Sequence, residues 1–263
     1  INVRSPGQGV SPQKYEQLLG KTIQRSIEED GFFFDSDLSE FRVEPRQYSF
    51  DRPWGIPVRY HDFNEYNDRI KPELFEFHLS YSDMDLEISD FLSGTYVCEF
   101  VVHAPELFSN SRLMDLASQD EEYRQFSIRE TQRVIDITRQ LKQYFPKTSR
   151  PMIVANVGGF TMDASMPVEL RELHYQTFAK SLLALDLEGV ELIPQTMAPF
   201  PWHFGGQRYQ NIFVHIDEIL EWCKKLELRM CFDISHTRLT CNHFGLDFYD
   251  FAEKIAPISG HLH

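Results

Sequence analysis

Aspartate and histidine side chains gather at two places late in this sequence, each at the close of a hydrophobic run. In the segment CFDISH, Asp233 and His236 lie three positions apart, and in SGHLH, His261 and His263 lie two apart. Carboxylate oxygens and imidazole nitrogens bind divalent metal ions, and both groups transfer protons. The two segments therefore indicate a site for metal binding or acid–base chemistry.

Other hydrophobic runs also end in polar residues. Residues two positions apart on a strand share a face. Two sets share a face in this way, Arg59 with His61 and Glu76 with His78 and Ser80. His103 and Gln195 each lie alone at the end of a run. A single histidine at such a place is usually a hydrogen-bonded structural residue, and His215 and His243 fit that description. A whole set at equivalent strand ends favours one shared site.

The elements that must position these residues begin near residue 54, where short apolar runs alternate with amphipathic segments. The runs predicted as strands are 56–63, 74–83, 96–106, 151–160, 189–197, 228–236 and 258–263. The segments predicted as helices are 119–145, 167–186, 213–226 and 246–255. Alternating strands and helices predict a parallel sheet with helices packed against it.

The polar strand ends favour a (β/α)8, TIM-barrel-like α/β fold for residues 54–263, because such barrels carry their chemistry at the carboxyl ends of the strands. The last predicted strand is the seventh, so we expect a barrel that lacks its last strand. A doubly wound open sheet is the alternative, but the glycine-rich phosphate turn expected after its first strand is missing.

Residues 1–40 have a different character. The turn-forming segment SPGQGVSP precedes a predicted helix, PQKYEQLLGKTIQRSI, and then EEDGFFFDSDL, predicted as a turn and a short strand. This order resembles the second half of the SAF, or antifreeze-like, domain of sialic acid synthases. The resemblance implies a partial SAF segment at 1–40, a linker at 41–53, and a parent chain with an N-terminal synthase domain. Ile1 in place of methionine agrees with a fragment or a processed chain.

The segments FDISH and GHLH resemble motifs of the xylose-isomerase-like barrel superfamily, which contains sugar and sugar-phosphate isomerases and epimerases and a branch of DNA-repair nucleases. The resemblance implies that Asp233 and His263 are metal ligands and that His236 contacts the substrate. It places Gln195 where the superfamily has a metal-binding glutamate. The implied cofactor is a divalent metal: Mn²⁺, Co²⁺, Mg²⁺ or Zn²⁺.

Gln195 changes the expected chemistry. An amide oxygen can bind a metal but cannot accept a proton at neutral pH. Glu191 shares its strand face, yet at ~3.3 Å per residue it lies ~13 Å down the strand and cannot replace Gln195. The remaining candidates for a catalytic base are His103 and His236.

The segment APFPWHFGG, residues 198–206, follows the fifth predicted strand and should cover the barrel mouth. A sugar packs its C–H face on an aromatic ring while polar groups bind its hydroxyls. The predicted substrate-binding residues are Arg59, His61, His78, Trp202 and His203. An aromatic loop that only seals the core is the plainer alternative.

The composition limits the classes of partner and the cellular location that can be expected. The net charge is −14, with 40 acidic and 26 basic residues, which argues against a nucleic-acid partner. No apolar run reaches the ~18 residues of a membrane span, and no signal peptide opens the chain. Four cysteines without a paired spacing predict free thiols and a cytoplasmic protein. A homo-oligomer is compatible with these features.

The leading hypothesis is a sugar or sugar-phosphate isomerase or epimerase module, attached to an N-acetylneuraminate synthase-like parent and acting on a hexose or amino sugar. Two alternatives remain. A non-catalytic sugar-binding or assembly domain is favoured by Gln195 and the missing strand. A nuclease is disfavoured by the net charge and by the small number of visible metal ligands.

Overall fold

The computed structural model describes the chain apart from residues 1–2, 4–7, 39–50 and 201–207. The chain divides into two compact units, Ile1–Asp51 and Arg52–His263, which are described separately. Trp202 and His203, predicted to bind the substrate, lie outside the described residues, as does most of the predicted linker.

The first unit contains short helical turns: η1 (Pro12–Lys14), α1 (Tyr15–Leu18) and α2 (Asp35–Leu38). The prediction of a strand within residues 28–38 is wrong. The carboxylate of Asp37 accepts a hydrogen bond from the N–H of Phe34 at 2.9 Å, which closes the turn that begins α2. Arg25 pairs with the same carboxylate at 2.6 Å and ties this turn to the rest of the unit.

Parallel strands form the main sheet of the second unit. Its five strands, in spatial order, are β1 (Gly55–Val58), β2 (Leu74–His78), β3 (Glu99–His103), β4 (Met152–Ala155) and β6 (Glu191–Pro194). A parallel pair, β8 (Met230–Phe232) and β9 (Ser259–Leu262), follows it. The N–H of Thr196, just after β6, donates to the carbonyl of Cys231 at 3.0 Å, so β8 continues the order beyond β6.

The strand order follows the chain order without a reversal. A doubly wound sheet reverses its order at its switch point, so the TIM-barrel-like prediction is confirmed and the doubly wound alternative is wrong. Each predicted run overlaps a strand, although the strands are shorter. A small antiparallel pair, β5 (Phe160–Thr161) and β7 (Tyr209–Gln210), lies outside this order.

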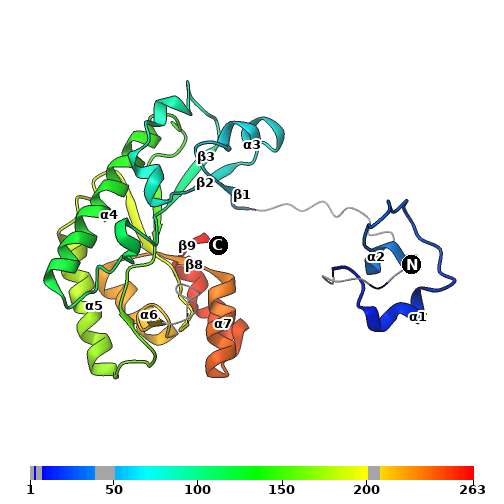
Figure 1. The fold of residues 1–263 in the computed structure, drawn as a ribbon. Helices are drawn as coiled ribbons and strands as arrows, with labels where there is room; N and C mark the ends of the chain where they lie inside the picture. Colours follow the sequence, from blue (N-terminus) through cyan, green and yellow to red (C-terminus); the bar gives the residue numbers. More distant parts are fainter. Residues whose placement is uncertain (1–2, 4–7, 39–50, 201–207) are drawn as a thin grey trace. The chain divides into compact units, whose positions relative to one another are not determined.

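Helices surround the strands of the second unit, as Figure 1 shows. The α-helices are α3 (Phe63–Arg69), α4 (Glu121–Lys142), α5 (Val168–Leu183), α6 (Ile216–Leu226), α7 (Ile234–Phe244) and α8 (Phe248–Ile255). The 3₁₀ turns are η2 (Tyr81–Asp85), η3 (Ile88–Asp90), η4 (Ser109–Ser111) and η6 (Ala256–Ile258). The sequence predicted α4, α5, α6 and α8 to within a few residues.

The two faces of the strands bury different layers. The face toward the helices packs aromatic rings, and Phe63, Phe77 and Phe145 lie within 5.7 Å of one another between ring centroids. The opposite face holds a smaller apolar layer formed by Leu74, Val101, Val154, Ile193 and Cys231. Because side chains alternate, the residues two positions further along these strands continue this inner face, and several of them are polar.

Candidate functional site

A pocket of about 520 Å³ lies at the carboxyl ends of the strands. His78 and His103 end β2 and β3, Gln195 and Asp233 directly follow β6 and β8, and His263 follows β9. All five residues line the pocket, together with His236 and Glu106. The predicted gathering of polar residues from separate strands at one end of the fold is therefore present in the structure.

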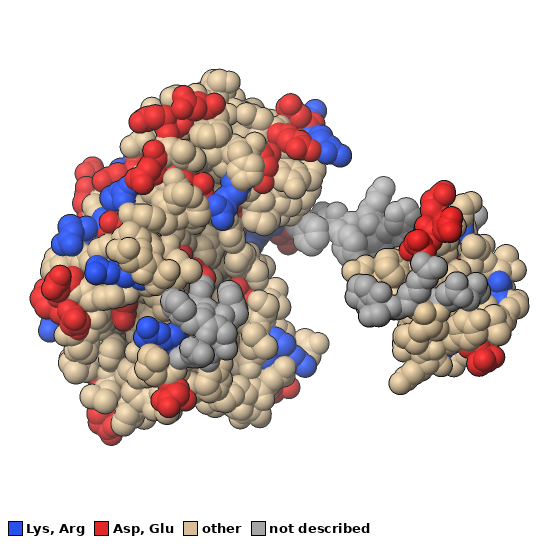
Figure 2. Space-filling model, in the orientation of Figure 1, with Lys and Arg blue, Asp and Glu red and all other residues tan. Residues whose placement is uncertain are grey.

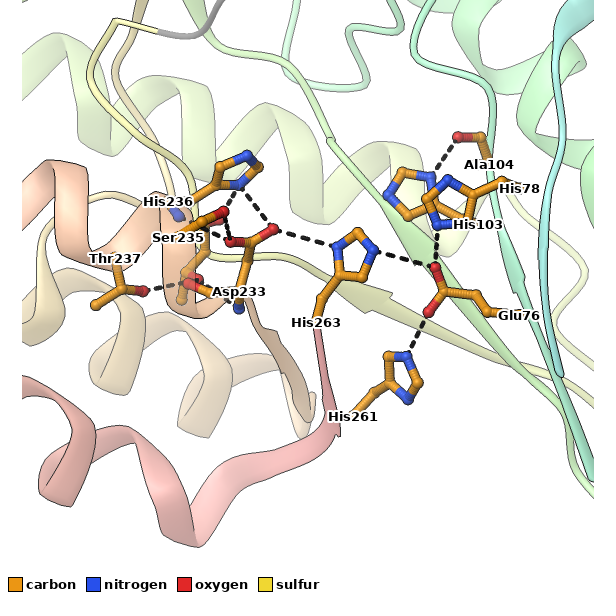
Figure 3. A network of polar contacts seen from close by, with 11 residues as sticks. Glu76, His78, His103, Ala104, Asp233, Ser235, His236, Thr237, His261 and His263 are labelled. Atoms are coloured by element: carbon orange, nitrogen blue, oxygen red, sulfur yellow. Dashed lines mark hydrogen bonds and ion pairs between the residues drawn. The ribbon is translucent and has the colours of Figure 1, made fainter. Parts of the chain in front are cut away.

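Glu76 contacts three histidines in a polar network beside this pocket (Figure 3). It is 4% exposed, and its Oε1 contacts Nε2 of His78 and lies 3.3 Å from Nε2 of His263. Its Oε2 lies 2.5 Å from Nε2 of His261. Burial alone would raise the pKa of Glu76, but the hydrogen bonds from His261 and His78 outweigh it and hold that pKa below its ordinary value.

Asp233 forms the second half of the network, on the other side of His263. Its Oδ2 lies 3.2 Å from Nδ1 of His263, and its Oδ1 accepts hydrogen bonds from the N–H of His236 and the hydroxyl of Ser235. Burial opposes ionisation of Asp233, yet these partners lower its pKa. Hydrogen bonding to Asp233 in turn raises the pKa of His263, against the effect of burial.

Asp233 reaches this position because it is the N-cap of α7. The sequence placed Asp233 and His236 at the end of a strand over 228–236, but β8 ends at Phe232 and α7 begins at Ile234. That prediction of a longer strand is wrong, since the side chain of Asp233 closes the first helical turn. His236 consequently projects from a helix rather than from a strand.

His103 and His236 share a feature that matters for proton transfer. Nδ1 of His103 lies 2.9 Å from the carbonyl oxygen of Ala104, and Nδ1 of His236 lies 2.9 Å from that of Thr196. A carbonyl oxygen only accepts hydrogen bonds, so each Nδ1 carries a proton and each neutral ring has its lone pair on Nε2. Burial lowers the pKa of both rings and favours this neutral form.

His78 and His103 form a stacked pair, with ring centroids 4.5 Å apart. The ring of His263 lies 5.2 Å from His78 and 5.4 Å from His103. Three imidazoles from three strands therefore meet over Glu76.

Gln195 is 1% exposed and lines the pocket. Neither atom of its side-chain amide has a hydrogen-bond partner among the described residues. A buried amide without partners is costly, which is the condition expected of a group that binds a ligand or an ion. Glu191 is bound elsewhere, by Arg229 at 2.6 Å, as its position far down the strand implied.

Of the two predicted substrate-binding residues near β1, one reaches the pocket and the other does not. Arg59 lines the pocket and pairs with Asp83 at 2.7 Å. The structure does not bring His61 to the pocket, since its side chain is 72% exposed. The chain turns away there because the carboxylate of Asp62 accepts a hydrogen bond from the N–H of Arg59 and α3 begins at Phe63.

Two members of the network, Glu76 and His261, were grouped with the polar strand ends by the sequence but were assigned no metal-binding, substrate-binding or catalytic role. Both share a strand face with a predicted site residue, Glu76 with His78 and His261 with His263. The alternation of side chains was therefore a signal that pointed to them. Glu106, which follows β3 and lines the pocket, was also missed.

The side chains of this cluster fit a divalent metal ion. Glu76, His78 and His263 each offer one ligand atom, and these atoms lie within 4.8 Å of one another. Carboxylate and imidazole donors suit divalent ions, and the amide of Gln195, which has no partner among the described residues, adds a further donor at the pocket lined by His78 and His263.

Comparisons with known proteins give one family and several related folds. A family model described as a Xylose isomerase-like TIM barrel matches residues 68–263. No match was found among curated proteins. Among the described residues, no helix is long and apolar enough to cross a membrane.

Among solved structures, D-allulose 3-epimerase from Methylomonas sp. in complex with D-allulose is 11% identical and superposes with a TM-score of 0.51, over 83% of this chain and 74% of that one. L-ribulose 3-epimerase is 13% identical, with a TM-score of 0.50 over 79% and 68%. A xylose isomerase domain protein from Planctomyces limnophilus is 14% identical, with a TM-score of 0.48 over 81% and 74%. At these identities the likeness concerns the fold.

Proposed function

Since the chain belongs to the Xylose isomerase-like TIM barrel family, we propose that its second unit is a metal-assisted sugar or sugar-phosphate isomerase or epimerase. The observation that carries the proposal is the pair His103 and His236. Two buried, neutral imidazoles of fixed tautomer line one pocket beside a set of metal-binding side chains. That combination suits the removal and return of a proton next to a carbonyl group.

The residues of the pocket divide this work. Asp233, His263 and Gln195 are the ligand set predicted from the sequence, and a bound divalent ion would supply Lewis-acid polarisation of the substrate carbonyl. His103 and His236 accept and return the proton through Nε2, because each Nδ1 is held by a backbone carbonyl. As a ligand, the amide of Gln195 would contribute its oxygen to the ion but exchange no proton.

A hexose or an amino sugar is the proposed substrate. The pocket of about 520 Å³ accommodates one sugar ring. Its wall combines imidazoles with Arg59 and the hydroxyl-bearing Ser80 and Tyr81. The predicted contacts from Trp202 and His203 would add an aromatic surface. D-allulose in the complex of the related epimerase supports the choice of a sugar.

Nucleic acid is a poor partner for this chain. The net charge is −14, and on the face shown in Figure 2 basic side chains are scattered among acidic ones. A duplex backbone is held by gathered Lys and Arg side chains.

The first unit supports a finer proposal about the parent protein. Its turn, short helix and SDL segment resemble part of a SAF domain, so we propose that the barrel is a sugar-acting module of a sialic acid synthase-like protein. The family match begins at residue 68 and therefore does not bear on the first unit.

A non-catalytic sugar-binding domain is the second candidate, and Gln195 favours it. The family resemblance places a glutamate at this position, and an amide cannot transfer a proton as a glutamate can. A domain that binds a sugar without converting it does not need that proton transfer.

Proton exchange separates the two candidates. The full chain is incubated with Mn²⁺ in D₂O, with hexoses and N-acetylhexosamines, and deuterium incorporation next to the carbonyl carbon is followed by NMR. An isomerase or epimerase that works by the proton transfer proposed above exchanges this proton, and Trp202→Ala should weaken sugar binding while leaving the fold intact. Saturation transfer to a sugar that is neither exchanged nor converted supports the binding domain. Neither exchange nor contact with any sugar refutes both.

A further inference from the structure

The wall of the pocket that follows β1 contains a pair of opposite charges. Arg59 comes directly after β1 and lines the pocket, and its Nη1 lies 2.7 Å from Oδ2 of Asp83. The side chain of Arg59 is 39% exposed, whereas that of Asp83 is 11% exposed and does not line the pocket. The guanidinium group therefore faces the pocket, and its charge is offset by a carboxylate that lies behind it.

Asp83 is held in this position by the turn to which it belongs. Its Oδ2 also accepts hydrogen bonds from the N–H of Ser80 at 2.7 Å and from the Ser80 hydroxyl at 2.8 Å, and these contacts cap η2. They do not involve Arg59, so the carboxylate is fixed beside the guanidinium without the help of a ligand. An anion that approaches Arg59 must overcome the repulsion of this fixed carboxylate.

The other charges near the pocket are mostly acidic. Glu106 and Asp233 line it, and Arg59 is the only lysine or arginine among its lining residues in the described part of the chain. Residues 201–207, which lie outside that part, contain no lysine or arginine. The carboxylates of Asp233 and Glu76 would offset the charge of a bound divalent ion. Gathered Arg and Lys side chains are what holds a phosphate group, and the described lining residues do not supply them.

The helix end at the pocket is also occupied by a carboxylate. Phosphate groups bind at helix N-termini, and TIM barrels use such a terminus after their late strands. Ser235 and His236, in the first turn of α7, line the pocket. The N–H of His236 donates to Oδ1 of Asp233 at 2.7 Å, so the aspartate caps this helix. A phosphate at this helix end would compete with the Asp233 carboxylate.

We propose that Asp83 is a positioning residue that acts through Arg59 and makes the pocket select a free sugar over its phosphate ester. This inference rests on the proposed function and decides between the two substrate classes that the function includes. Arg59 donates to sugar hydroxyls while Asp83 offsets its charge. A phosphate dianion instead meets the repulsion of Asp83 and of the lining carboxylates, and such a repulsive element is a common source of specificity.

Two matched pairs of ligands test this selection: D-fructose with D-fructose 6-phosphate, and N-acetyl-D-glucosamine with its 6-phosphate. Dissociation constants for the full chain with Mn²⁺ are measured by titration calorimetry at pH 7.5. We expect the wild type to bind at least one free sugar about tenfold or more tightly than its phosphate ester, because like charges in contact are costly.

Variants of the charge pair assign the selection to Asp83. Asp83→Asn removes the charge but keeps an acceptor oxygen for Ser80, so the cap of η2 is retained. It should lower the preference for the free sugar by about tenfold or more, and adding Arg59→Gln to D83N should remove this gain of the phosphate ester. Asp85→Asn is the matched control, because Asp85 belongs to the same turn but pairs with Arg133 at 2.5 Å and does not line the pocket. D85N should leave the preference unchanged.

Ionic strength gives an answer that needs no variant and holds even if D83N fails to fold. Salt screens the repulsion between a phosphate and an acidic pocket, so wild-type affinity for the phosphate ester should rise relative to that for the free sugar from about 20 to about 300 mM NaCl. A cationic phosphate site would show the opposite trend.

The outcomes separate this inference from the proposed function. A phosphate ester that binds the wild type as tightly as its free sugar, or that loses affinity with salt, would overturn the inference and leave the isomerase or epimerase proposal standing. The same holds for a preference that D83N does not change. The expected selection without proton exchange would refute the catalytic proposal alone. Binding of no ligand of either pair would overturn both.

Discussion

The energetic importance of the polar network can be tested at the contact between His261 and Glu76. Removal of His261 in His261→Ala takes one hydrogen bond from a buried carboxylate, and hydrogen bonds to charged groups contribute about 1.5–3 kcal/mol. Glu76 keeps His78 and His263 as partners, so it is not left as an isolated buried charge. In a Glu76→Gln background the same truncation removes a neutral hydrogen bond of about 0.5–1.5 kcal/mol.

The difference between these two effects predicts a coupling free energy of about 1–2 kcal/mol between the two residues. It is measured with H261A, E76Q and the double variant by urea unfolding at pH 7.5 with EDTA present, following the transition of the second unit. The exposed pair Lys254 and Asp250, at 2.9 Å, is the control and should couple by less than about 0.5 kcal/mol. A coupling for His261 and Glu76 as small as that of the control would refute the reasoning.

Three further outcomes follow from described contacts. Gly158 has a φ of +96° and an added Cβ would lie 2.0 Å from Oδ1 of Asp115, so Gly158→Ala should destabilise by about 2–5 kcal/mol in urea unfolding. Gly94→Ala, at a φ of +74° with nothing within 4 Å, should lose only about 1–2 kcal/mol, and equal losses would contradict the argument. Hydrogen bonding to Asp233 raises the pKa of His263 above the ordinary ~6.5, so below that pKa a metal ion must displace a proton from His263. The Zn²⁺ affinity should therefore fall by about tenfold for each pH unit below the raised pKa. An affinity that stays constant between pH 5.5 and 7.5 would show that His263 is not a ligand. His103→Gln should slow proton exchange in a sugar by about 10²- to 10⁴-fold with little change in Zn²⁺ affinity, and an unchanged exchange rate would exclude His103 as the base.

The order of strands and helices was largely predictable because each element carries its own signal. The run LFEFH is β2 and the run MIVA lies in β4, each bounded by turn residues, and α4 shows apolar residues at helical spacing. Strand ends were less predictable. The predicted run 228–236 continues past Phe232 through Asp233 to His236, and the capping geometry of Asp233 shows where β8 stops.

The site was predictable where alternation along one strand determines which side chains share a face. His78, His103, Gln195, Asp233 and His263 all reach the pocket. His61 does not, because the carboxylate of Asp62 turns the chain before the face continues.

The central place of Glu76 could not be read from β2 alone. Glu76 joins the network because it contacts His261 in β9 and His263 directly after β9, both distant from it in sequence. Sequence periodicity predicts on which face of its own strand a side chain lies. It does not predict which residue of another element contacts that side chain.

The separation of 185 positions between Glu76 and His261 also constrains how the protein folds. Each strand and its following helix can form from neighbouring residues, but the pocket is complete only when β9 docks beside β8. Contacts between residues so far apart in sequence form late and slowly, because closing the long loop is entropically unfavourable until other contacts are in place. Until β9 docks, the carboxylate of Glu76 remains hydrated. We therefore expect native secondary structure to appear before the ability to bind Zn²⁺ in a refolding experiment, and the interval between the two signals would report the docking of β9.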